Sequence, residues 1–107
     1  MYEVCEVVVT GPDADWLAGL AQNLLTNRLI ACAHIVDVRS IHRSGGQIHD
    51  RLQASAAMHT RRSRVTAIVD HVEEAHPDDT PSVIVTPITD GNPAYLQWVR
   101  NRTKIQK

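Results

Sequence analysis

The spacing of apolar residues along the chain predicts two amphipathic helices. In residues 13–28 and again after Thr60, apolar side chains recur at i, i+3, i+4 and i+7, which places them on one helix face. These residues are Leu17, Leu20, Ala21 and Leu24 in the first helix, and Val65, Ile68, Val69 and Val72 in the second. We expect Asp13 and Thr60 to cap the two helices, and His76-Pro77 to end the second one.

The other apolar segments predict four strands, at residues 3–10, 29–43, 48–59 and 82–88. Gly45-Gly46 suits a two-residue hairpin turn between the second and third strands, because both positions require positive φ angles. Pro87 lacks a backbone donor and therefore favours an edge position for the last strand. Asn92-Pro93 starts a short terminal helix. The order β-α-β-β-α-β followed by a helix predicts an α+β, ferredoxin-like fold, with both main helices on one face of the sheet.

The hairpin turn also determines which side chains share a face. With Gly45-Gly46 as the turn, Ser44 lies opposite Gln47, and the pairing continues residue by residue along both strands. One face is then mainly apolar and belongs under the helices, whereas the other face is mixed and polar. Asp37 and Arg39 are misfits on the apolar face. A β-bulge, or a hairpin that extends past the helices, would explain them.

Length, composition and charge add further constraints. The 107 residues are expected to form a single domain over residues 1–107. The chain has two Trp, two Tyr and no Phe, so its core must be aliphatic, and subunit contacts are expected to add stability. Eleven Lys and Arg against twelve Asp and Glu give a net charge of −1, which argues against a nucleic-acid or membrane-surface module.

The sequence also bears on the cellular compartment. The first residues lack the pattern of a signal peptide, and no apolar run approaches the ~20 residues of a membrane span. Cys5 and Cys32 form neither a disulfide framework nor a zinc knuckle. We therefore expect a reduced, cytoplasmic protein.

Candidate chemistry gathers on the polar face of the hairpin. There Cys32 lies opposite His59, with His34 two residues along on the same side. A thiolate with two imidazoles suits copper or zinc. The alternative is that Cys32 is a small buried hydrophobe and that the histidines line an interface. Cys32 and His59 are also the one nucleophile–base pair that the sequence brings together, but no oxyanion-hole loop accompanies them, so we expect no enzyme activity.

Several segments together resemble the CutA family of divalent-cation tolerance proteins. The similarity runs in order from about residue 4 to 103. It is carried by residues 8–13 (VVTGPD), 28–35 (RLIACAHI), 40–48 (SIHRSGGQI), Thr60-Arg61, 76–81 (HPDDTP) and 87–98 (PITDGNPAYLQW). The resemblance implies a ferredoxin-like subunit in a tight, PII-like homotrimer, in which hairpin strands pair across subunits. It also implies an association with copper and other divalent metals, without catalysis.

The family's metal ligands carry over only in part. Cys32 and His76 match two ligand positions of the family, whereas Val9 and Ala75 stand where some members have a cysteine and a histidine. Other departures from the family pattern gather in the implied cleft between subunits: His42, Ser44, Gln53, His59, Asp78 and Ser82. The chain therefore resembles a divergent member of the family.

Three functions follow as hypotheses. The first is a non-enzymatic trimer that binds a divalent metal such as copper through Cys32 and His76, with His34 or His59, and contributes to the response to metal ions. The second is a PII-like trimer that binds a small-molecule effector in the cleft between subunits. The third is a structural trimer without a ligand.

Overall fold

The computed structural model describes residues 3–104. The elements follow one another as β1 (Val4–Gly11), α1 (Ala14–Thr26), β2 (Cys32–Ser44), β3 (Gln47–Arg61), the 3-10 turn η1 (Arg62–Arg64), α2 (Val65–Ala75), β4 (Val83–Pro87) and α3 (Pro93–Arg102). The predicted order of helices and strands is therefore confirmed. None of the helices within these described residues is long and apolar enough to cross a membrane.

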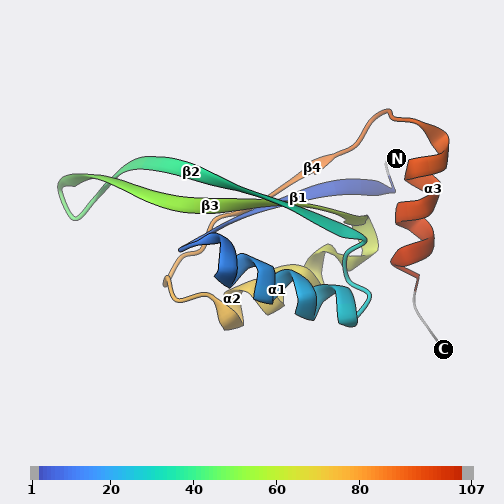
Figure 1. Cartoon of the computed structure of the whole chain (residues 1–107), viewed down its shortest axis with the longest axis horizontal. Coiled ribbons are helices and arrows are strands. Elements are labelled where there is room, and N and C mark those ends of the chain that lie inside the picture. The colour runs from blue at the N-terminus through green and yellow to red at the C-terminus, as the bar shows by residue number, and fades with distance from the viewer. Residues whose placement is uncertain (1–2, 105–107) are drawn as a thin grey trace.

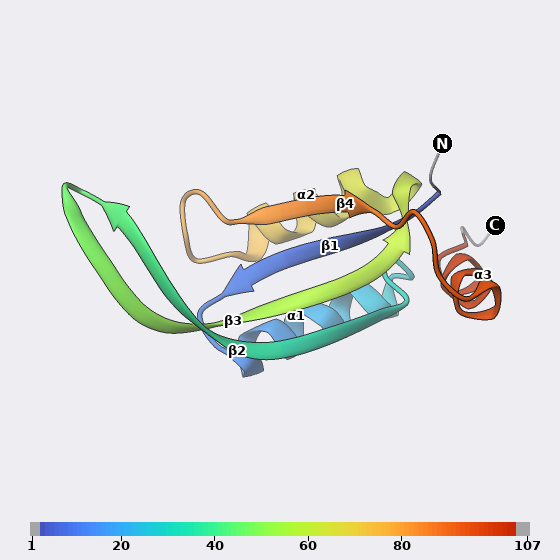
Figure 2. The same cartoon turned by 90° about the horizontal axis from the view of Figure 1, so that it is seen from above.

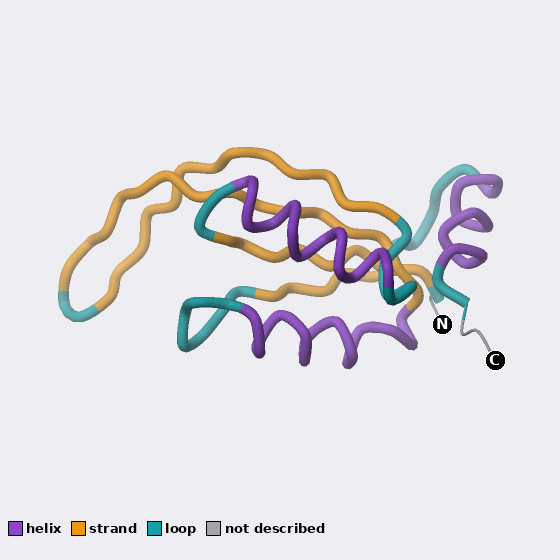
Figure 3. The backbone as a smooth tube through the Cα atoms, turned by 60° about the horizontal axis from the view of Figure 1, so that its bottom comes forward, coloured by secondary structure: helices purple, strands orange, loops and turns teal. Residues whose placement is uncertain are grey.

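The four strands form one antiparallel sheet in the order β2-β3-β1-β4, which is the ferredoxin-like arrangement. Helices α1 and α2 lie side by side against one face of this sheet, as Figures 1 and 3 show. β4, with its Pro87, is an edge strand, as the missing backbone donor predicts. The fold thus has one covered face and one face that carries the polar side chains of the hairpin.

The β2–β3 pairing has the predicted register over its whole length, from Cys32 opposite His59 to Ser44 opposite Gln47. Gly45 and Gly46 have φ angles of 59° and 76°, the left-handed values that a two-residue hairpin turn needs. A one-residue slip would have moved every side chain of one strand to the opposite face. The register therefore determines which side chains lie on the polar face of the hairpin.

The hairpin extends well past the two helices, as the view from above shows (Figure 2). Along the helix-facing side of β3, Met58 is fully buried, whereas Leu52 is 80% exposed. Here the exposed Arg39 and Asp50 form a two-pronged ion pair, with N–O distances of 2.9 and 2.6 Å. Donation from the guanidinium lowers the pKa of the Asp50 carboxyl. Because the ladder is uninterrupted, the length of the hairpin explains the misfit of Asp37 and Arg39, and a bulge does not.

The core between sheet and helices is aliphatic, as the composition predicts. No aromatic side chain among residues 3–104 is fully buried. The core is built from Val7, Val9, Leu17, Leu24, Ile30, Met58, Ile68 and Val72, with Cys5 at one end. Gly11 ends β1 where a Cβ atom would come within 2.9 Å of the side chains of Trp16 and Leu17. Glycine at this position lets α1 pack closely on the sheet.

Two predicted helix boundaries are wrong. Thr60 does not cap α2, because β3 continues to Arg61 and the buried Thr60 hydroxyl donates to the Leu29 carbonyl at 2.6 Å. The first helix ends at Thr26 and not at residue 28, because Arg28 adopts a left-handed conformation with φ 58°. The Arg28 and Leu29 amides then donate back to the carbonyls of the last turn.

The other predicted helix ends are confirmed. The Asp13 side chain accepts from the Trp16 amide at 2.8 Å and so caps α1. The second helix ends at Ala75, directly before His76-Pro77. Pro93 occupies the first turn of α3, where its missing donor is tolerated.

Neighbouring leucines in α1 provide a test of this packing. Leu24 is fully buried in the core, whereas Leu25 is 41% exposed. We predict that Leu24→Ala lowers the free energy of unfolding by about 2–5 kcal/mol, because it removes buried methyl groups and leaves a cavity. Leu25→Ala removes the same atoms from the same helix and should cost less than about 1 kcal/mol. Denaturant unfolding measures both, and equal losses would contradict this orientation of α1.

Candidate metal centre

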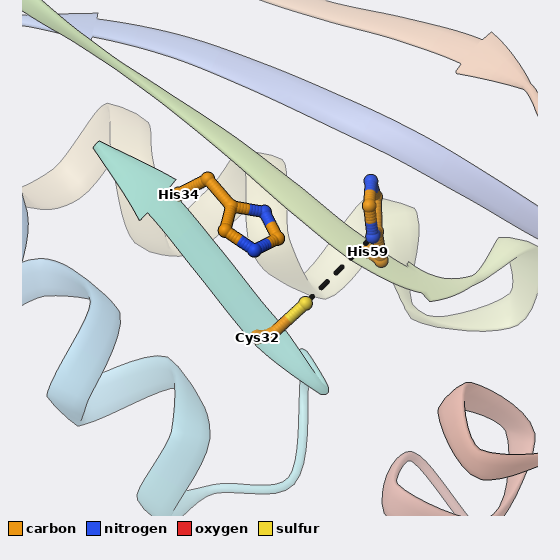
Figure 4. A group of neighbouring side chains, drawn as sticks. All are labelled: Cys32, His34 and His59. Atoms are coloured by element: carbon orange, nitrogen blue, oxygen red, sulfur yellow. Dashed lines mark hydrogen bonds between the residues drawn. The ribbon is translucent and has the colours of Figure 1, made fainter. Parts of the chain in front are cut away.

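Three side chains predicted as metal ligands lie together on the face of the sheet opposite α1 and α2. Cys32 and His59 are direct partners in the β2–β3 ladder, and His34 follows Cys32 on the same side of β2. Their ligand atoms all lie within 4.8 Å of one another. Figure 4 shows the two β2 side chains and the β3 imidazole directed toward a common space. The register alone accounts for this grouping, since it places the three residues on one face.

Hydrogen bonds hold the His59 ring on both of its nitrogens. Its Nε2 lies 2.9 Å from a carboxylate oxygen of Glu6, the residue opposite His59 on β1. Its Nδ1 lies 2.6 Å from the hydroxyl of Tyr95 on α3, and 3.7 Å from Sγ of Cys32. The same hydroxyl is 3.1 Å from that sulfur. Strands β1, β2 and β3 and helix α3 therefore all contribute to one polar cluster.

The donors and acceptors in this cluster can be assigned from their chemistry. An ionised carboxylate only accepts hydrogen bonds, so Nε2 of His59 carries the proton that it shares with Glu6. In the neutral ring Nδ1 is then an acceptor, and the Tyr95 hydroxyl donates to it. The Cys32 thiol in turn donates to the Tyr95 oxygen. This assignment leaves the lone pair of Nδ1 facing the thiol and the hydroxyl.

Tyr95 remains a neutral hydroxyl in this setting. Burial raises the pKa of its phenol well above the ordinary value, and the hydrogen bond with Cys32 and the electrostatic influence of the nearby acidic side chains, Cys32 and Glu6, raise that pKa further. The phenol therefore keeps its proton and continues to donate to His59. Tyr95 also stacks on Trp98 of the same helix, with ring centroids 5.7 Å apart.

His34 differs from its two neighbours because it is exposed. Its ring lies edge-on to that of His59, with the centroids 5.8 Å apart. In the part of the chain that the structure describes, its side chain is not held by a hydrogen bond, so the imidazole can turn toward the cluster. Of the three side chains, His34 is therefore free to rotate, whereas hydrogen bonds hold Cys32 and His59 in place.

His76, the fourth predicted ligand, is not part of this group. It is buried, with Nε2 donating to the Thr10 carbonyl at 2.7 Å and Nδ1 accepting from the Asp78 amide at 3.0 Å. Its ring also packs edge-on against Trp16 of α1, on the helix-covered side of the sheet. With both ring nitrogens engaged by the backbone, His76 joins the chain after α2 to the end of β1.

Sequence reasoning missed two members of the cluster. Glu6 could have been found, because alternation along the first strand and its pairing with the third place Glu6 beside His59. Tyr95 carried no such signal, because it lies 36 residues from His59 in sequence. Its position depends on how α3 packs at the end of the sheet. There Val99 is buried with Val4 and Ala31.

A second polar feature lies near the base of the hairpin extension. A cleft of about 400 Å³ opens between the hairpin and the segment that joins α2 to β4. It is lined by Thr10, Ser40, Ile41, His42, Arg51, Gln53, Asp78, Thr80 and Ser82. Four of these, His42, Gln53, Asp78 and Ser82, are positions at which the sequence departs from the resembled family pattern. These four departures therefore lie around a single cleft.

Comparison with known proteins identifies the family. A family model described as CutA1 divalent ion tolerance protein matches residues 5–102. The chloroplastic protein CutA 1 of Oryza sativa is 33% identical over 92% of this chain, which spans 56% of that longer protein. The divalent-cation tolerance protein CutA of Pyrococcus horikoshii is 32% identical, with 92% of this chain and 96% of that protein covered.

Solved structures agree with the sequence comparison. The crystal structure of CutA1 from Oryza sativa superposes with a TM-score of 0.93 at 31% identity, over 98% of this chain and 97% of that one. CutA1 from Ehrlichia chaffeensis gives a TM-score of 0.91 at 27% identity, over 98% and 99%. The family match spans most of the chain, and the fold is shared over nearly all of it. The chain therefore belongs to the CutA1 divalent ion tolerance family.

Proposed function

We propose that this protein is a non-enzymatic homotrimer that binds a metal ion such as copper at Cys32, His34 and His59 and contributes to the response to metal ions. The observation that carries the proposal is the convergence of one sulfur and two imidazole donors within 4.8 Å of one another. Relatives named divalent-cation tolerance proteins support the same class of function. His76 is left out of the proposed ligand set, because the backbone engages both of its ring nitrogens.

The donor set fits a soft or borderline metal. A cysteine sulfur with two imidazoles suits Cu(I), Cu(II) or Zn(II), whereas Mg²⁺ and Ca²⁺ prefer oxygen ligands. Glu6 accepts the Nε2 proton of His59, which is the outer-shell contact that orients a metal-binding histidine and makes its other nitrogen more basic. A metal ion at this site would be coordinated by Nδ1 of His59, Sγ of Cys32 and the imidazole of His34.

The same geometry argues against nucleophilic catalysis. Glu6, His59 and Cys32 lie in the order of a carboxylate–imidazole–thiol triad. However, the Tyr95 hydroxyl lies 2.6 Å from Nδ1 and 3.1 Å from Sγ. It donates to the Nδ1 lone pair, which would otherwise accept the proton of the Cys32 thiol. The sulfur itself is 3.7 Å from Nδ1. We therefore propose a binding role for Cys32 rather than a catalytic one.

Trimer formation accounts for the exposed hairpin. Val36, Ile41, Ile48 and Leu52 are 59–80% exposed. Within residues 3–104, both outer strands of the sheet, β2 and β4, have one edge without a strand partner. We propose that these strands pair across subunits of a homotrimer.

We also propose one domain over residues 1–107 and a reducing compartment such as the cytoplasm, in keeping with free thiols at Cys5 and Cys32.

The polar cleft supports a second candidate function, the binding of a small-molecule effector. Its lining combines Arg51 with hydroxyl, amide and carboxylate side chains, which suits a polar ligand such as a nucleotide or a carboxylate. This candidate is distinguished from metal binding by Arg51→Ala, which alters the cleft and leaves the three sulfur and imidazole donors unchanged.

Metal binding is predicted to depend on Cys32. We expect calorimetric titration of the wild type with Cu(I) or Zn(II) to give a saturable heat with one site per chain, and Cys32→Ser to lose it, because the soft donor is removed. The exposed histidines of the hairpin, His42 and His49, provide the matched control. Their double alanine variant should retain the site. Affinity should also be lower in acid than at neutral pH, because imidazole binds metal only when neutral.

Other outcomes of the titration are equally informative. An unchanged heat in Cys32→Ser would contradict metal binding at this cluster. Absence of heat from both proteins would favour the effector function, for which thermal shifts with nucleotides and carboxylates, lost in Arg51→Ala, are the expected sign.

The trimer is predicted to depend on the hairpin. We expect sedimentation equilibrium to give three times the 11.9 kDa chain mass for the wild type. Leu52→Lys should dissociate the assembly, because it places a charge among the apolar side chains of the hairpin. Leu25→Lys makes the same exchange at an exposed site on α1 and should leave the trimer intact. A monomeric wild type would contradict the proposed assembly.

A further inference from the structure

The hydroxyl of Tyr95 lies within hydrogen-bonding distance of two of the three donor atoms of the cluster. It is 2.6 Å from Nδ1 of His59 and 3.1 Å from Sγ of Cys32. Nδ1 has one lone pair, which can bond either to the Tyr95 proton or to a metal ion. Nε2 offers no second route, because it carries a proton that is engaged by Glu6. Occupation of the cluster and the Tyr95 hydrogen bond therefore exclude each other at Nδ1.

We infer that Tyr95 is an internal competitor for the metal-binding site and that its displacement couples metal binding to α3. This inference rests on the proposed function, since it concerns the same three donors. It adds a regulatory element that the ligand set alone does not contain. The Tyr95 hydroxyl lowers the metal affinity of the site. When a metal ion binds, displacement of Tyr95 changes the position of the first turn of α3.

The surroundings of Tyr95 show how such a signal would spread. Tyr95 lies in the first turn of α3, which begins at Pro93 after Asn92. The far end of the helix is held by separate hydrogen bonds, because Arg61 and Arg64 donate to the carbonyls of Arg100 and Thr103 at 2.9 and 2.8 Å. Movement of Tyr95 is thus expected to disturb the first turn of α3 while the last turn remains attached to the sheet.

Trp98 is placed to report this movement. Its ring stacks on that of Tyr95 at 5.7 Å, with an angle of 25° between the planes. The Arg102 guanidinium lies 5.6 Å from the centre of the same ring. Trp98 is 36% exposed, so a change in its stacking partner alters its contact with water. The other tryptophan, Trp16, belongs to α1 on the covered side of the sheet.

The first test measures affinity. Calorimetry with Zn(II) should show that Tyr95→Phe binds about tenfold more tightly than the wild type, because the ring stays in place while the competing hydrogen bonds to His59 and Cys32 are gone. Trp98→Phe changes the aromatic stack without touching the hydroxyl, and its affinity should match the wild type. Equal affinity in Tyr95→Phe would overturn competition. Weaker binding would also overturn it, since Tyr95 would then be a ligand.

The second test follows α3 directly. Zn(II) has a filled d shell and does not quench fluorescence through unpaired electrons. In a Trp16→Phe background, Zn(II) should shift the emission of Trp98 and saturate at the concentration found by calorimetry. Adding Tyr95→Phe should abolish the shift while binding persists. Binding without any shift in the Tyr95-containing protein would overturn the coupling.

These outcomes separate the two proposals. If neither the wild type nor Tyr95→Phe binds Zn(II) or Cu(I), the proposed metal function fails, and the inference falls with it. If both bind with equal affinity and Trp98 does not respond, metal binding stands and only the role of Tyr95 is overturned. Binding seen in Tyr95→Phe alone would support strong competition by the hydroxyl.

Discussion

The structure depends on the antiparallel ladder between β2 and β3. Because the two strands pair without interruption from Cys32 and His59 to the Gly45-Gly46 turn, each side chain of the hairpin is assigned to one face. The helix-facing side supplies Met58 and its neighbours to an aliphatic core. The opposite side gathers a thiol and two imidazoles. One backbone constraint thus produces both the packing that stabilises the subunit and the cluster on which the proposed function rests.

His59 links this cluster to the rest of the molecule. The carboxylate of Glu6 fixes its proton on Nε2, so the lone pair of Nδ1 is directed toward Cys32 and Tyr95. In this cluster, two groups suited to metal binding, Nδ1 of His59 and Sγ of Cys32, are already hydrogen-bonded to the Tyr95 hydroxyl. The proposed metal affinity would therefore depend on the release of the Tyr95 hydroxyl from His59 and Cys32 as well as on the three donors.

Sequence reasoning could predict what depends on local pattern. The strand order, the hairpin register, the cap at Asp13 and the proximity of Cys32 to His59 all follow from alternation, turn chemistry and helix spacing. It failed at Thr60 and Arg28, where tertiary burial and a left-handed residue decide the boundaries. It also placed His76 among the ligands on family resemblance, whereas both ring nitrogens bond to the backbone. The contribution of Tyr95 required the docking of α3, which no local pattern specifies.

The central claim is that Nδ1 of His59 is the unprotonated nitrogen that faces the thiol. Long-range ¹H–¹⁵N correlation spectra of the metal-free protein measure this directly, because they distinguish the two ring nitrogens and show which one carries the proton. The account predicts a neutral ring with its proton on Nε2, and a shift of the Nδ1 resonance when Zn(II) is added. A proton on Nδ1 in the metal-free protein would contradict the account.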